Sequence, residues 1–198
     1  EGRGRGRWRV VGASPRSATS HVTCEVAVAP GKYVVLPIIF FCGGNGTTRA
    51  VHVGLHTSKP VGAEEERVAP ASAARALASF VRARGTLRQL FPGCALYEFH
   101  DNGGVLICGE NTARRQPRRF SVQLDCSESA NLVPVRGALS TSDTLGMGRG
   151  QLVAALISPS RRAGWTHRYA LQCRQDALFG EAQRPPVHAD GLFAPFDL

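Results

Sequence analysis

The fold is decided by residues 118–143, RRFSVQLDCSESANLVPVRGALSTSD, which are expected to begin as an alternating strand and to return, after a polar turn, as a second strand. Phe120, Val122 and Leu124 alternate with polar residues, and this period of two is typical of a half-buried strand. Residues 127–131 (SESAN) are turn formers whose side chains bond their own backbone. Gly137 frees the backbone where the chain turns again. The stretch contains no nucleophile–base pair, phosphate loop or metal-ligand cluster, so the pattern predicts architecture rather than chemistry.

A longer motif extends from this stretch in both directions. Its centre is the run 125–129 (DCSES), with 109–111 (GEN) upstream and with 151–153 (QLV) and 166–168 (THR) downstream. Its single positions are Asn131, Val133, Arg136, Gly137, Leu139, Thr141 and Asp143. Together these residues resemble the C-terminal domain of calpains of the small-optic-lobes type, a branch of the papain-like cysteine protease superfamily. The resemblance is strongest over 104–173.

Outside that block the resemblance is weaker. Residues 29–37 (APGKYVVLP) are similar to a strand near the end of calpain β-sandwich domains, and between 62 and 93 we find no match beyond an expected helix. The resemblance implies a non-catalytic C-terminal domain that serves interaction or regulation in a cytoplasmic calpain-type cysteine endopeptidase, or in a calpain-like relative. It assigns a structural role to the motif residues Asp125, Cys126, Ser129, Asn131, Arg136, Gly137 and Asp143.

Periodicity along the chain predicts a mostly β protein, an antiparallel β-sandwich of roughly eight to ten strands with one Ala-rich helix. The helix is expected over 70–84, because Pro70 suits its first turn and Gly85 ends it. Besides 118–125, strands are expected over 21–29, 32–41, 48–57, 95–100, 105–110, 151–158 and 165–173, with a helical hint at 175–179. No apolar run approaches the ~20 residues that a membrane-spanning helix needs.

Composition divides the chain into three parts. Residues 1–19 form an Arg/Gly-rich arm, interpreted as mobile or ordered by a partner. Residues 20–175 carry the predicted β-sandwich domain, in which an internal boundary near 60–70 stays open. Residues 176–198 form a Pro-rich C-terminal tail.

No residue is predicted to be catalytic, to bind a metal or to bind a cofactor. The six cysteines lack any CxxC pair and are interpreted as reduced, buried thiols. Cys126 follows Asp125, which raises the pKa of the thiol and opposes a thiolate. His52 and His56 share one face of an expected strand, but no turn supplies the further ligands of a zinc site.

The net charge of +9, from 24 Lys and Arg against 15 Asp and Glu, leaves two classes of partner open. We favour other domains of the parent chain, or protein partners in a larger assembly, on three features: the Arg-rich arm, an apolar terminus with no obvious core role, and the edges that a β scaffold offers for strand addition. The alternative is a basic module that binds nucleic acid or acidic lipid through the arginines. The candidate partner-binding residues are Leu192, Phe193, Phe196, Arg3, Arg5 and Arg7.

Overall fold

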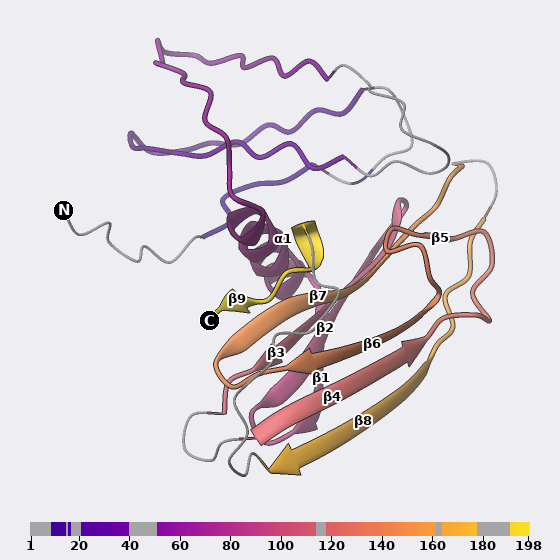
Figure 1. Cartoon of the computed structure of the whole chain (residues 1–198). Helices are drawn as coiled ribbons and strands as arrows, with labels where there is room; N and C mark the ends of the chain where they lie inside the picture. The colour runs from indigo at the N-terminus through magenta and orange to yellow at the C-terminus, as the bar shows by residue number, and fades with distance from the viewer. Residues whose placement is uncertain are drawn as a thin grey trace.

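The computed structural model of the chain describes residues 9–14, 16, 21–39, 51–113, 118–160, 164–177 and 191–198. Over these residues the chain forms one α-helix and nine strands (Figure 1). In chain order the elements are α1 (Pro70–Arg84), β1 (Thr86–Phe91), β2 (Cys94–Asp101), β3 (Gly104–Asn111), β4 (Arg118–Asp125), β5 (Val133–Pro134), β6 (Ser140–Leu145), β7 (Arg149–Ile157), β8 (Ala170–Ala177), a 3-10 turn η1 (Gly191–Phe193) and β9 (Phe196–Asp197). The prediction of a mostly β protein with one Ala-rich helix is confirmed.

The strands form two antiparallel sheets that pack as a sandwich. The larger sheet has the order β1-β2-β3-β7-β5, with β9 added beside β7, and the smaller one has the order β6-β4-β8. Between the sheets lies a core to which β4 contributes Phe120, Val122 and Leu124, all fully buried. Gln123 and Asp125 point to the other side of β4 and are exposed, as the period of two predicts. This alternation fixes which face of the smaller sheet meets the core.

Helix α1 covers the outer face of the larger sheet (Figure 1). Pro70 occupies the first turn of the helix, where its missing N–H costs no hydrogen bond, and the Gly85 N–H donates to the Val81 oxygen at 2.7 Å at the other end. The buried stripe of α1 packs against the outward side chains of β3 and β7. This second core consists of Ala74, Leu77, Ala78, Val81, Leu106, Cys108, Leu152, Ala155, Phe193 and Phe196. The described residues include no helix long and apolar enough to cross a membrane.

The C-terminal residues belong to this core. Phe193 and Phe196 are only 8% and 4% exposed, and Phe196 pairs with Gly150 where β9 joins β7. The expectation that the apolar terminus has no core role is therefore wrong. Single aromatic residues beside prolines carry no periodicity, so the sequence pattern gave no sign of the strand that they form.

The strands expected before the helix do not form in the described residues. The stretches 21–39 and 51–69 contain no strand (Figure 1). The side chains of Val22, Val26 and Val28 are exposed. The remainder of the ranges 32–41 and 48–57 lies outside the described residues. An alternating pattern indicates a strand only if a neighbouring strand and an apolar surface are present to pair with it. Among the residues that the structure describes, no strand pairs with 21–39 or 51–69, so the prediction for the described part of these ranges is wrong.

Two further differences concern the last part of the sandwich. The expected strand 165–173 begins later, at Ala170, and the helical hint at 175–179 is wrong over 175–177, because β8 continues to Ala177 and pairs with β4. Strands β1 and β6 were not predicted; β6 (STSDTL) is too polar to show an apolar period. The predicted domain boundaries, including the arm at 1–19 and the tail from 176, stay predictions.

Candidate interaction groove

The motif residues at the start of the turn after β4 build a rigid connection. The Asp125 carboxylate accepts the Ser127 N–H at 3.0 Å, and this bond lowers the pKa of Asp125. The Cys126 N–H donates to the Leu139 oxygen at 2.9 Å, and its side chain is buried. The Ser129 hydroxyl donates to the Arg168 oxygen at 2.9 Å and accepts the Arg168 N–H at 3.1 Å. The turn therefore fixes a distant segment, 164–169, beside it.

Asn131 completes this attachment. It holds φ = +57°, a left-handed conformation that Asn tolerates better than most residues, and its Nδ2 donates to the Gly164 oxygen at 2.7 Å. Between Asn131 and Ser129, Ala130 exchanges two backbone hydrogen bonds with Thr166 at 3.0 and 3.1 Å. The run 129–131 thus acts as a short partner strand for 164–168.

A second group of motif residues forms a buried charged network. The Arg136 Nη1 lies 2.6 Å from Asp143 Oδ2 and donates to the Val153 oxygen at 3.0 Å, while Gln151 Nε2 donates to Asp143 Oδ1 at 2.7 Å. The Arg136 guanidinium also stacks over the Phe193 ring at 4.9 Å. Burial raises the pKa of Asp143, and the bonds to Arg136 and Gln151 oppose that shift. The network links β6, β7 and η1, which is a structural role; Gly137 beside it turns with φ = +79°.

The buried thiols are poor nucleophiles. Burial raises the pKa of Cys126 to about 11 and that of Cys94 to about 12, and it also raises the pKa values of Cys108 and Cys173. These four thiols are therefore protonated at neutral pH. Cys24 departs from the expectation of burial, because it lies exposed in the segment 21–39.

No group of three or more His, Cys, Asp and Glu residues in the described part of the chain could hold a metal ion. His52 and His56 lie in an exposed stretch that forms no strand. They therefore do not share the strand face that was expected from the sequence.

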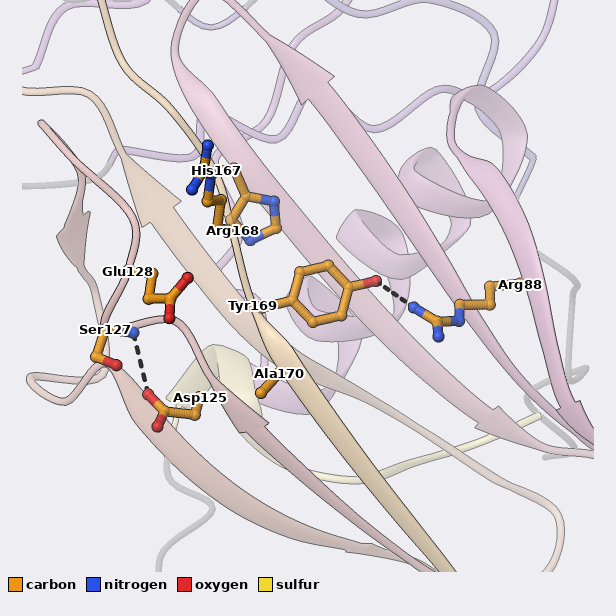
Figure 2. A pocket seen from close by; sticks show the side chains of 8 residues that line it. All are labelled: Arg88, Asp125, Ser127, Glu128, His167, Arg168, Tyr169 and Ala170. Carbon is orange, nitrogen blue, oxygen red and sulfur yellow. Dashed lines mark hydrogen bonds between the residues drawn. The ribbon is translucent and has the colours of Figure 1, made fainter.

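A groove of about 490 Å³ opens where segment 164–170 meets the turn after β4 (Figure 2). Side chains of both charges surround it, and Tyr169 supplies an aromatic wall. The lining residues are Arg88, Asp125, Ser127, Glu128, His167, Arg168, Tyr169 and Ala170. Arg168 and Glu128 are exposed at its rim.

The wall of the groove is held by contacts across the two sheets. The Tyr169 hydroxyl donates to the Glu98 carboxylate of β2 and accepts a hydrogen bond from Arg88 Nη1 of β1 at 2.9 Å. The His167 ring lies 5.1 Å from the Tyr169 ring and 5.4 Å from the His100 ring. Burial and the hydrogen bond to Glu98 raise the pKa of Tyr169 to about 12, so its phenol stays a donor. These contacts make the groove a preformed surface.

His167 is the polar group that these contacts leave incomplete. Its Nε2 is buried without a hydrogen-bond partner among the described residues. Burial and the neighbouring His100 lower the pKa of His167, so the ring is neutral at pH 7. A neutral imidazole can donate or accept through this nitrogen, as a polar ligand requires.

The groove combines predicted and unpredicted residues. Asp125 and the segment 166–168 belong to the sequence motif, whereas Arg88 and Tyr169 were missed. Arg88 gave no signal because β1 was not foreseen. The candidate anchors Phe193 and Phe196 do not line the groove, since both are buried under α1, and Leu192 is partly buried there. Arg3, Arg5 and Arg7 lie outside the described residues.

Residues 80–177 match the family described as Calpain-D-like, C-terminal domain. The chain therefore carries a calpain-type C-terminal domain, and the resemblance expected from the sequence is confirmed at this level. The match begins in α1 and includes β1 and β2, so our expectation of no match between 62 and 93 is wrong from residue 80 onward. No solved structure matches the chain.

Proposed function

We propose that this domain is a non-catalytic interaction and regulatory domain of a cytoplasmic calpain of the small-optic-lobes type, or of a calpain-like relative. Its groove binds an extended segment of a protein partner or of another domain of the parent chain. The observation that supports this proposal is the preformed groove lined by Arg88, Tyr169 and Asp125 at an open edge of the sandwich. The confirmed family supports the calpain part of the proposal.

The backbone beside the groove favours an extended polypeptide. Thr166 and Arg168 direct their backbone groups toward the run 129–131, where they are bonded. In extended chain, successive residues direct their backbone groups to opposite sides. His167 therefore directs its N–H and C=O away from that run, toward the side on which a further strand would pair. A peptide in this position gains main-chain hydrogen bonds, and the groove selects its side chains.

The charge of the groove distinguishes a peptide from a phosphate-bearing partner. Asp125 and Glu128 repel phosphates, whereas a polypeptide offers both cationic and anionic groups to a mixed lining. A nucleic-acid or acidic-lipid partner bound through arginines would instead bind far more weakly as salt rises. A peptide held by main-chain hydrogen bonds and by the Tyr169 ring depends on salt only weakly.

Under this proposal, the cysteines of this domain do not hydrolyse peptide bonds. Burial keeps Cys94 and Cys126 protonated, so a protease activity of the parent needs a cysteine, a histidine and a polar orienting residue elsewhere. Reading the parent sequence for those three motifs separates an active endopeptidase from a relative without activity.

The groove is tested with a displayed library of random peptides selected on the full chain. The selected peptides are then measured against Arg168→Glu and against Arg67→Glu, a matched control because Arg67 is exposed in the segment 51–69. We expect Arg168→Glu to weaken binding and Arg67→Glu to leave it unchanged, at low and at moderate salt. Equal binding by both variants would show that the peptides do not bind in the groove. Loss of all binding at moderate salt would favour the alternative, binding of nucleic acid or acidic lipid through the arginines.

A further inference from the structure

We propose that the turn between β2 and β3 is an arginine-recognition site, which Arg16 of the same chain fills in this structure. The ligand class is an arginine together with its own backbone N–H. The site docks the chain before the domain onto the domain itself, and an arginine-bearing segment of a partner competes for it. This inference does not depend on the groove beside Tyr169.

The turn binds both the side chain and the backbone of Arg16. The Nη2 atom donates to the Gly104 oxygen at 2.7 Å and lies 2.8 Å from Asp101 Oδ1. The Arg16 backbone N–H donates to the other carboxylate oxygen, Asp101 Oδ2, at 3.1 Å. The side chains of Arg16 and Asp101 are 14% and 13% exposed, so the pair is largely removed from water. The turn therefore recognises both the guanidinium and the backbone N–H of the arginine.

The walls of the site fit an arginine better than a lysine. The guanidinium carbon lies 5.6 Å from the centre of the Phe99 ring, where a flat, weakly hydrated cation stacks well. One guanidinium nitrogen reaches a carbonyl and a carboxylate together. A lysine ammonium carries the same charge but lacks the planar face that lies over Phe99.

The turn is shaped for this occupant. The Gly103 N–H donates to Asp101 Oδ1 at 2.8 Å, which holds the carboxylate in place from within the turn. A Cβ on Gly103 would lie 2.4 Å from the Cβ of Arg16. Gly103 does not hold a positive φ, so its lack of a side chain is needed for contact with Arg16 rather than for the turn itself.

The contact is suited to exchange. Arg16 Nε and Nη1 are buried without a hydrogen-bond partner among the described residues. A buried donor without a partner is destabilising, which offsets part of the stabilisation from the ion pair. The turn lies within the family match at 80–177, whereas Arg16 lies outside it. Release of Arg16 therefore removes a contact between the matched domain and the chain before it.

The site is tested with a labelled synthetic peptide of residues 10–21 (VVGASPRSATSH) and the full chain, by fluorescence anisotropy. In the wild-type chain the tethered Arg16 excludes the peptide, because a tethered ligand acts at an effective concentration in the millimolar range. We expect Arg16→Ala to open the site and to bind the peptide at least about tenfold more tightly than the wild type does. The same peptide with lysine in place of its arginine should bind poorly, and Arg16→Ala combined with Asp101→Asn should not bind.

A second measurement covers a failure of the Arg16→Ala chain to fold. Gly103→Ala keeps Arg16 but blocks its approach, so hydrogen exchange in the turn 101–104 should become faster than in the wild type. A folded Arg16→Ala chain that ignores the peptide, or that binds the lysine peptide equally well, would overturn the inference. Unchanged exchange in Gly103→Ala would overturn it independently.

Discussion

The C-terminal aromatic residues are expected to stabilise the sandwich, and Phe196→Ala tests this most directly. Phe196 is 4% exposed in the second core, against α1 and β7. Truncating a buried Phe to Ala lowers the free energy of unfolding by about 3–5 kcal/mol, because the transfer free energy of the ring is lost and a cavity is left behind. Whole domains are stable by only about 5–15 kcal/mol, so this single change removes a large share of the total.

The cost is measured by urea unfolding of the full chain. Leu87→Ala on β1 is the control, because its side chain is 54% exposed and surface changes stay within about 0.5 kcal/mol. If the C-terminus were a free partner-binding tail, Phe196→Ala would unfold at the same urea concentration as the control. That result would refute the core role argued here.

Gly150 gives an independent test of the same packing. A Cβ at Gly150 would lie 2.6 Å from the Phe196 ring, so Gly150→Ala overpacks this corner and is expected to cost about 1–3 kcal/mol. Combining it with Phe196→Leu, which removes the ring, should recover part of that cost. Strictly additive effects of the two changes would show that the ring does not lie against Gly150.

Three further predictions concern the motif residues and the groove. Asp143→Asn should destabilise the chain by about 3–5 kcal/mol in urea unfolding, because it leaves Arg136 as an uncompensated buried charge; replacing both residues with apolar ones should recover most of the loss. The chain should not hydrolyse denatured protein substrates, since the pKa of Cys126 is about 11; cleavage that Cys126→Ala abolishes would contradict this. The pKa of His167 is lowered in the folded state from the ordinary histidine value of 6.5. Below pH 6.5 the unfolded state therefore binds more protons than the folded state does. Stability should therefore fall as pH drops below about 6.5, and His167→Gln should reduce that dependence.

The sequence pattern predicts the elements whose burial is regular. Strand β4 alternates cleanly, and α1 has a proline at its start and a glycine at its end. Strands β3 and β7 are buried at nearly every residue, and their continuous apolar runs mark strands that are covered on both faces. In these elements the local pattern and the tertiary environment agree.

The pattern fails where burial depends on polar groups or on partners far along the chain. In β6 the buried, inward residue is Asp143, which is bonded to Arg136 and Gln151. Because this inward residue is charged, the sequence of β6 shows no alternation of apolar and polar residues. Residues 21–29 have the opposite mismatch, an apolar period without a surface to cover. The candidate groove combines β1, the turn after β4 and the segment before β8, which only the folded topology brings together.

The sequence motif and the groove are nevertheless connected through the backbone. Ser129 and Asn131 do not line the groove, yet they bond the carbonyls of Arg168 and Gly164 and so determine where segment 164–169 lies. On its other side the same segment is held by the bonds of Tyr169 to Glu98 and Arg88. The polar bonds of the motif therefore end on a segment that lines the groove. Because they end there, residues of the sequence motif are also residues that position the groove.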